Sequence, residues 1–77
     1  MELYFYEDCE YSQIVINTIA NLEISEKFIF KDIRENNKYA KELSSLTGDE
    51  TVPCLVTGTG AMKEAIKIRK YLVSEFG

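Results

Sequence analysis

The sequence contains no histidine and no tryptophan, a single proline, and only two cysteines in 77 residues. The lack of histidine excludes catalysis by an imidazole and most kinds of zinc site. Cys9 and Cys54 lie far apart in the sequence, and two cysteines cannot form a four-ligand metal site alone or a disulfide-stabilised scaffold. Any chemistry must therefore use a thiol, a carboxylate or a tyrosine hydroxyl.

Long hydrophobic runs and clustered positive charge are missing as well. The apolar runs are too short to cross a bilayer, and the start of the chain has no basic region ahead of an apolar block, as a signal peptide would. Thirteen acidic and nine basic residues give a net charge of −4, which argues against nucleic acid as a partner. We therefore expect a cytoplasmic protein of one domain, residues 1–77, with no membrane or nucleic-acid partner.

Short apolar runs alternate with amphipathic stretches along the chain. A strand–helix–strand leg at the start implies a parallel, right-handed crossover, whereas the tight turn GTG after the third strand implies an antiparallel hairpin. The pattern predicts an α/β fold with a mixed four-stranded sheet and three helices, in the order βαβαββα. The second strand is expected to be buried on both faces. The predicted strands cover residues 2–6, 27–33, 52–57 and about 61–62, and the predicted helices cover 10–22, 36–48 and 63–75.

The segment YEDCEYS, residues 6–12, places Cys9 where the first strand passes into the first helix. Unpaired backbone N–H groups at the start of a helix favour negative charge, which lowers the pKa of a thiol there. Ser12, one turn further on, can donate a hydrogen bond to that sulfur. The alternative interpretation is that Cys9 is a small buried residue in an acidic turn.

A second notable segment is TGDETVP, residues 47–53, which leads into the third strand. Pro53 is a candidate for a cis peptide bond. A cis bond would turn the backbone of Val52 outward and expose its N–H and C=O to an extended, peptide-like ligand. The alternative is an ordinary trans proline that prevents the preceding helix from extending.

The C-x-x-S turn after the first strand and T-G-x-x-T-V-P before the third together resemble the glutaredoxins, which belong to the thioredoxin-like superfamily. The resemblance covers nearly the whole chain, including the order and lengths of the elements. It implies that Cys9 is the nucleophile and that Tyr11 flanks a glutathione site. It also implies that the backbone at Thr51, Val52 and Pro53 pairs with the cysteine residue of glutathione.

The stretch MKEAIKIRKYL, residues 62–72, is similar to the E-S-x-x-I-x-x-Y-L pattern of glutathione-transferase N-terminal domains. By this similarity Glu64 would hold the amine of the γ-glutamyl group, although Ala65 replaces the serine of the pattern. Lys38 or Lys41 would meet the glycyl carboxylate. The length of the chain suggests that a transferase's second, helical domain is not part of it.

Two departures from the glutaredoxin pattern affect the chemistry at Cys9. Ser12 replaces the second cysteine, which leaves a monothiol mechanism, and the turn does not read C-G-F-S, the signature of the monothiol glutaredoxins that share an iron–sulfur cluster. Three carboxylates, on Glu7, Asp8 and Glu10, surround the thiol. Each would cost a thiolate roughly 0.8 kcal/mol at about 7 Å and an effective dielectric of about 60. We therefore expect the pKa of Cys9 to be close to that of an ordinary thiol.

The sequence as a whole indicates a monomeric, glutathione-dependent thiol–disulfide oxidoreductase that reduces protein–glutathione mixed disulfides. Cys9 and Ser12 would be catalytic, glutathione would be a co-substrate, and no metal is expected. Cys54 could resolve a disulfide with Cys9, but a packed core thiol is the role we expect. Two other functions stay open: a non-catalytic glutathione- or peptide-binding module, and an iron–sulfur carrier.

Overall fold

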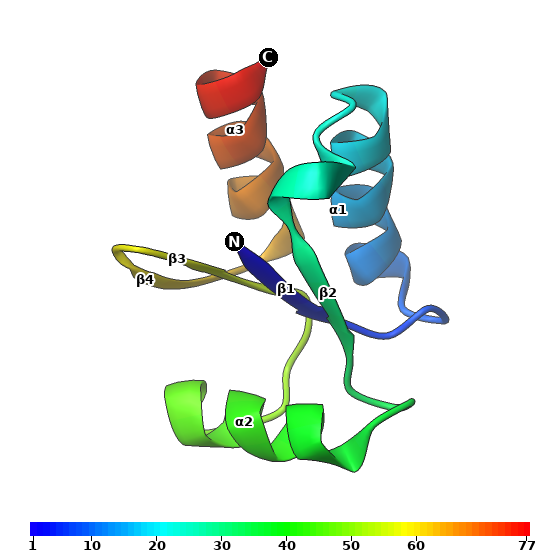
Figure 1. The fold of residues 1–77 in the computed structure, drawn as a ribbon, viewed down its shortest axis with the longest axis vertical. Helices are drawn as coiled ribbons and strands as arrows, with labels where there is room; N and C mark the ends of the chain where they lie inside the picture. Colours follow the sequence, from blue (N-terminus) through cyan, green and yellow to red (C-terminus); the bar gives the residue numbers. More distant parts are fainter.

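The chain folds into a four-stranded mixed sheet with helices on both faces (Figure 1). The computed structural model describes all residues 1–77. The expected thioredoxin-like order βαβαββα is confirmed, and one short 3-10 helix, η1, is added before the second strand. The elements are β1 (Glu2–Phe5), α1 (Glu10–Asn21), η1 (Ser25–Lys27), β2 (Ile29–Asp32), α2 (Asn37–Thr47), β3 (Cys54–Thr57), β4 (Gly60–Lys63) and α3 (Ala65–Phe76).

The strands lie in the order β2-β1-β3-β4, with β1 and β2 parallel and the other two pairs antiparallel. Tyr4 in β1 is the register partner of Cys54 in β3, and Cys54 is in turn the partner of Lys63 in β4. The last residues of β1 and β4 and the first residue of β3 therefore meet at one end of the sheet. The loops that carry Cys9, Pro53 and the start of α3 leave from this end.

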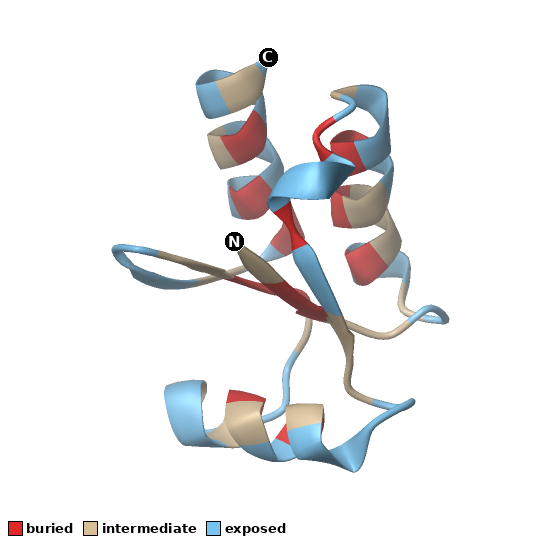
Figure 2. Cartoon of the chain, in the orientation of Figure 1, coloured by how far each residue is buried: buried red, intermediate tan, exposed pale blue.

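Helices α1 and α3 cover one face of the sheet and α2 covers the other (Figure 1). Because side chains alternate along a strand, Leu3 and Leu55 point to the α1/α3 face while Tyr4 and Cys54 point to α2. Figure 2 shows the buried residues gathered between these layers. The core on the α1/α3 face contains Leu3, Val15, Ile19, Ile24, Phe28, Leu55, Ala65, Ile68 and Leu72, and the smaller core under α2 contains Tyr4, Leu43 and Cys54.

The ends of α2 follow the signals in the sequence. Asn36 is the N-cap, and its Oδ1 accepts a hydrogen bond from the Lys38 N–H at 2.9 Å. Gly48 ends the helix in the left-handed conformation, with φ of 89°, which glycine adopts without a Cβ clash. None of the three α-helices is long and apolar enough to span a membrane.

The expectation that the second strand is buried on both faces is wrong. Strand β2 lies at the edge of the sheet and pairs only with β1, so part of its surface stays open to solvent. Ile29 and Phe30 are 58% and 38% exposed, although Phe28, just before the strand, is buried. An apolar run of this length cannot distinguish a central strand from an edge strand, since both need one covered face.

Candidate functional site

Cys9 occupies the turn between β1 and α1 and is the N-cap residue of α1. Its backbone is extended, with φ of −87° and ψ of 118°, and its N–H donates to the carbonyl of Tyr6 at 3.2 Å. The Sγ atom accepts a hydrogen bond from the backbone N–H of Ser12 at 3.4 Å. The thiol thus takes the position of a capping oxygen at a helix N-terminus, where backbone donors favour a thiolate.

The pKa of the Cys9 thiol is lowered from its ordinary value. Burial is the largest single influence and raises the pKa, but hydrogen bonds from the hydroxyl and N–H of Ser12, from the N–H of Tyr11 and from the Tyr6 side chain together outweigh it. Our expectation of an ordinary pKa is therefore wrong. The surrounding carboxylates of Glu7, Asp8 and Glu10 are on exposed residues, where water screens them, whereas the hydrogen-bond donors lie against the sulfur.

Ser12 is fully buried, and its hydroxyl is the one buried side-chain oxygen or nitrogen without a hydrogen bond of ordinary geometry. The hydroxyl is nevertheless close enough to the Cys9 sulfur to lower the pKa of that thiol. A buried hydroxyl without a partner costs stability. Its proton is therefore available to a charged sulfur, and a thiolate at Cys9 would give this hydroxyl the partner that it lacks.

A groove of about 840 Å³ opens at the same end of the sheet. It runs between the Pro53 loop and the first turns of α3, and the exposed ring of Tyr11 borders it from α1. Five of the six residues predicted for a glutathione site line it: Tyr11, Thr51, Val52, Pro53 and Glu64. The complete lining is Tyr11, Asp49, Thr51, Val52, Pro53, Lys63, Glu64, Ala65, Ile66, Lys67 and Lys70.

Val52 lines this groove, and its backbone is not paired with the rest of the protein. The Val52–Pro53 peptide bond is cis. Val52 lies outside the strands, and neither its N–H nor its C=O forms a hydrogen bond within the protein. Backbone groups that are not paired in this way can form hydrogen bonds with the backbone of a short extended peptide.

An ion pair between Asp49 and Lys63 connects the loop before Pro53 to the end of β4. Asp49 Oδ1 also accepts the N–H of Thr51 at 2.9 Å. The ammonium of Lys63, with the N–H of Thr51, lowers the pKa of Asp49 to about 2. Neither Asp49 nor Lys63 was identified from the sequence, although Asp49 belongs to the TGDETVP segment that was.

Glu64 lines the groove immediately before α3 and has a left-handed backbone with φ of 72°. Its carboxylate makes no capping hydrogen bond to α3 but forms an ion pair with Lys67, at 3.0 Å between Oε2 and Nζ. Lys67 was also missed from the sequence, where the only signal was its place one turn after Glu64.

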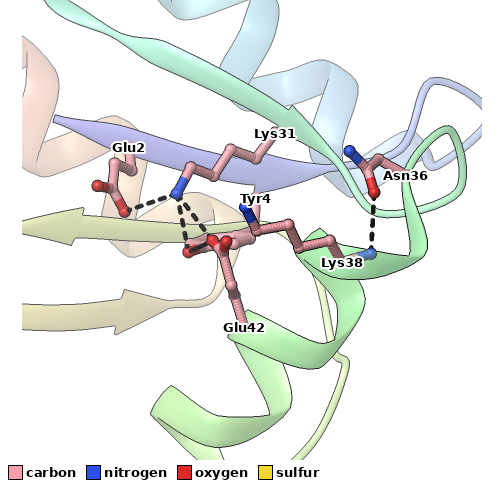
Figure 3. Close-up of polar contacts among 6 residues, drawn as sticks. All are labelled: Glu2, Tyr4, Lys31, Asn36, Lys38 and Glu42. Atoms are coloured by element: carbon pink, nitrogen blue, oxygen red, sulfur yellow. Dashed lines mark hydrogen bonds and ion pairs between the residues drawn. The ribbon is translucent and has the colours of Figure 1, made fainter.

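Lys41 does not reach the groove. It lies on α2 and lines a separate hollow of about 520 Å³ on the other face of the sheet, together with Lys38. Figure 3 shows the polar cluster in this hollow, in which Lys31 contacts Glu42 at 2.8 Å and Glu2 at 3.4 Å. The helical periodicity placed Lys41 on α2 correctly, but only the packing of α2 on the sheet decides which way that side of the helix faces.

Cys54 is fully buried in the small core under α2. Burial raises the pKa of its thiol, and the charges of Lys63 and Asp49 act in opposite directions. A buried, protonated thiol is a poor nucleophile. Since Cys54 faces α2 while Cys9 begins a helix on the other face, the fold favours a packing role for Cys54.

Comparison with known proteins bears on the fold and the family of the chain. No curated protein matches the chain. The crystal structure of a glutathione S-transferase domain-containing protein from Marinobacter aquaeolei VT8 shares the fold with a TM-score of 0.78 and 21% sequence identity. That alignment covers 100% of this chain but 39% of the other, so this chain spans about two fifths of the length of its relative.

Residues 3–77 match the family model described as the glutathione S-transferase N-terminal domain. The match covers nearly the whole chain and includes the β1–α1 turn, the Pro53 loop and the start of α3. This family agrees with the similarity found in residues 62–72, whereas the match does not establish the more specific resemblance to the monothiol glutaredoxins. The chain belongs to the glutathione S-transferase N-terminal domain family, within the thioredoxin-like superfamily.

Proposed function

We propose that this domain binds glutathione in the groove and uses Cys9 as a monothiol nucleophile to reduce protein–glutathione mixed disulfides. The observation that supports it most strongly is the position of the Cys9 sulfur at the start of α1, with Ser12 N–H as its donor. The lowered pKa of Cys9 gives a larger thiolate fraction near neutral pH, and the thiolate is the nucleophile in thiol–disulfide exchange.

The reaction has two exchanges. In the first, the Cys9 thiolate attacks the glutathione sulfur of the mixed disulfide, a Cys9–glutathione disulfide forms, and the protein thiolate leaves and takes a proton from water. In the second, the thiolate of another glutathione attacks the glutathione sulfur held on Cys9. Oxidised glutathione leaves, and the Cys9 thiolate is restored. The net reaction consumes one glutathione and one mixed disulfide and releases one protein thiol and one oxidised glutathione, so one disulfide bond is exchanged for another.

The groove offers contacts for the glutathione moiety in both exchanges. The free N–H and C=O of Val52 would pair with the backbone of its cysteine residue, and the carboxylate of Glu64 would accept its amine. Tyr11, 65% exposed, would cover the ligand from α1. These contacts would hold the glutathione sulfur towards the sheet end from which the Cys9 turn begins.

A non-catalytic binding module is the second candidate, and one observation favours it. Glu7, Asp8 and Glu10 are all exposed beside Cys9, so their charges would repel the thiolate of an incoming glutathione. In that case the domain would bind glutathione or a cationic peptide without turning over a disulfide.

The decisive experiment measures glutathione-dependent reduction of a mixed disulfide between glutathione and cysteamine. We expect turnover by the wild type, loss of turnover to the uncatalysed background in Cys9→Ser, and unchanged turnover in the matched control Cys54→Ser. Turnover that survives Cys9→Ser would overturn the proposal. Binding of glutathione by a wild type without any turnover would establish the second candidate instead.

A further inference from the structure

Strand β2 has one open edge, because it pairs only with β1. The N–H of Ile29 points to that neighbour and donates to the carbonyl of Met1 at 2.8 Å. Since the direction of the backbone groups alternates along a strand, the N–H groups of Phe30 and Asp32 point the other way, out of the sheet. An edge with free backbone groups can pair with another strand.

The open edge of β2 lacks the charged side chains that usually protect one. Both charged residues of the strand are engaged within the chain instead. The Lys31 ammonium contacts the Glu42 carboxylate at 2.8 Å, as Figure 3 shows, and the Lys31 side chain is 14% exposed. Asp32 Oδ1 accepts two backbone N–H groups of the following turn, at 2.9 and 3.2 Å. The exposed side chains of the strand are therefore apolar: Ile29 is 58% exposed and Phe30 38%.

The free backbone groups of this edge are complementary to themselves. They are the C=O of Phe28, the N–H and C=O of Phe30, and the N–H of Asp32. The Phe28 N–H already donates to Ser25 at 3.1 Å, and the Asp32 C=O already accepts the Asn36 N–H at 3.2 Å. When two β2 strands pair antiparallel with Phe30 opposite Phe30, the two Phe30 residues bond to each other and each Asp32 N–H meets a Phe28 C=O. A shift by two residues in either direction would instead aim a free Phe30 group at an engaged one.

This register also brings matching side chains together. Phe30 would meet Phe30 of the other copy on the α1/α3 face, where the rings of Phe28 and Phe5 already contact it with centroids 5.9 and 6.1 Å away. Aromatic pairs opposite each other stabilise neighbouring strands. On the α2 face, Ile29 would lie opposite the aliphatic part of Lys31, which covers apolar surface well.

The charges that flank the strand are complementary as well. Glu26 precedes β2 and Arg34 follows it; both are exposed, and neither forms an ion pair within the chain. The guanidinium of Arg34 lies over the ring of Tyr6, 3.6 Å from its centroid, a contact that leaves its N–H groups free. Antiparallel pairing brings the start of one strand to the end of the other, so each Glu26 would face the Arg34 of the other copy.

We propose that the β2 edge binds a second copy of this chain, with the two β2 strands antiparallel about a two-fold axis and the two sheets joined into one. No residue of β2 lines the groove, so this inference does not depend on the proposed function. It differs from the monomer expected from the sequence. One short strand from each copy makes a small interface, so the dimer is weak and depends on concentration.

Sedimentation equilibrium of the full chain, from micromolar to submillimolar concentration, tests the association. The average mass should rise from 8.9 kDa towards twice that value. Phe30→Lys removes the aromatic pair and places like charges opposite each other, so it should weaken the association by about tenfold. Val73→Lys changes a residue on α3 that is 50% exposed, and it should have no effect. A monomer at every concentration, or a dimer that only Val73→Lys weakens, would overturn the proposal.

Charge reversal at the ends of the strand tests the register, and it stays informative if Phe30→Lys fails to fold. Glu26→Arg and Arg34→Glu should each weaken the association by about fivefold, because each brings like charges together. The double variant restores opposite charges and should recover the affinity. A double variant that is weaker than both single variants would refute this register.

Amide hydrogen exchange tests the pairing of the backbone. The N–H groups of Phe30 and Asp32 should exchange more slowly as the concentration rises, because they gain acceptors only in the dimer. Glu26→Arg should reduce this protection at a given concentration. A dimer in which neither N–H is protected would show that the copies meet at another surface.

Discussion

Tyr4 and Cys54 are register partners across β1 and β3, and both side chains pack into the small core under α2. Cys9 begins α1, which covers the opposite face of the sheet. Alternation of side chains along β3 thus places Cys54 in the α2 layer, whereas Cys9 belongs to the layer of α1. This separation leads to the first prediction.

Mild oxidation of the protein in the presence of glutathione should modify Cys9 and not join it to Cys54. Cys54 is fully buried and its pKa is raised by burial, so it is not available to resolve a disulfide at Cys9. Mass spectrometry of the intact protein should show the mass of one added glutathione, lost in Cys9→Ser and kept in Cys54→Ala. A loss of two hydrogens without an adduct would show an internal disulfide and contradict this assignment.

The rate at which iodoacetamide alkylates Cys9 should rise with pH and level off below the pH at which an ordinary thiol does. The thiolate is the reactive form, and the pKa of Cys9 is lowered, in part by the Ser12 hydroxyl. Ser12→Ala should move the pKa of Cys9 upward, because the hydroxyl is lost while the backbone N–H stays. The pH profile is best recorded in the Cys54→Ala background, where Cys9 is the only thiol. An alkylation midpoint that is the same with Ser12 and with Ser12→Ala would contradict this prediction.

The same substitution should stabilise the fold. The Ser12 hydroxyl is buried without a hydrogen bond of ordinary geometry, so Ser12→Ala should raise the free energy of unfolding by about 1 kcal/mol. Urea denaturation at acid pH, where the Cys9 thiol is protonated and offers the hydroxyl no charged partner, provides the measurement. Thr18→Val is the control, because the Thr18 hydroxyl donates to the carbonyl of Ile14 at 2.8 Å and its removal should give no gain. A less stable Ser12→Ala would mean that the hydroxyl has a partner.

The polar cluster of Figure 3 should make stability depend on pH. Hydrogen bonds from Lys31 and Tyr4 lower the pKa of Glu42 below its ordinary value. A carboxyl with a depressed folded-state pKa contributes full stability above its unfolded pKa, about 4.3, and loses it as the pH falls through the folded value. Glu42→Gln should thus be less stable than the wild type at pH 7, and the two should converge in acid. A pH-independent difference between their urea midpoints would contradict this.

Leu43 should carry most of the attachment of α2 to the sheet. It is fully buried and packs in one cluster with Tyr4 and Cys54, so Leu43→Ala should destabilise the fold by about 2–5 kcal/mol. Leu46, three residues later on the same helix, is 54% exposed, and Leu46→Ala should change stability by no more than about 0.5 kcal/mol. Thermal unfolding of the two variants makes the comparison. Similar losses of stability in the two variants would contradict this packing of α2 on the sheet.

Local signals in the sequence located the elements and the two segments of the site. Asn36 and Gly48 mark the ends of α2 to within one residue, because capping depends on neighbouring residues alone. The same local signals placed Cys9 between the first strand and the first helix, and it is the N-cap residue of α1.

The sequence by itself determined the order of the elements, the place of Cys9 at the start of α1 and the segment that holds Pro53, because hydrophobic periodicity and capping are short-range properties. Only the tertiary structure decided that β2 is an edge strand, that Lys41 faces away from the groove, and that Lys67 pairs with Glu64 beside it. It also decided the direction of the Cys9 pKa shift. The physical reason is common to all four: each depends on which groups lie within a few ångströms in space, and the packing of helices on the sheet sets those distances.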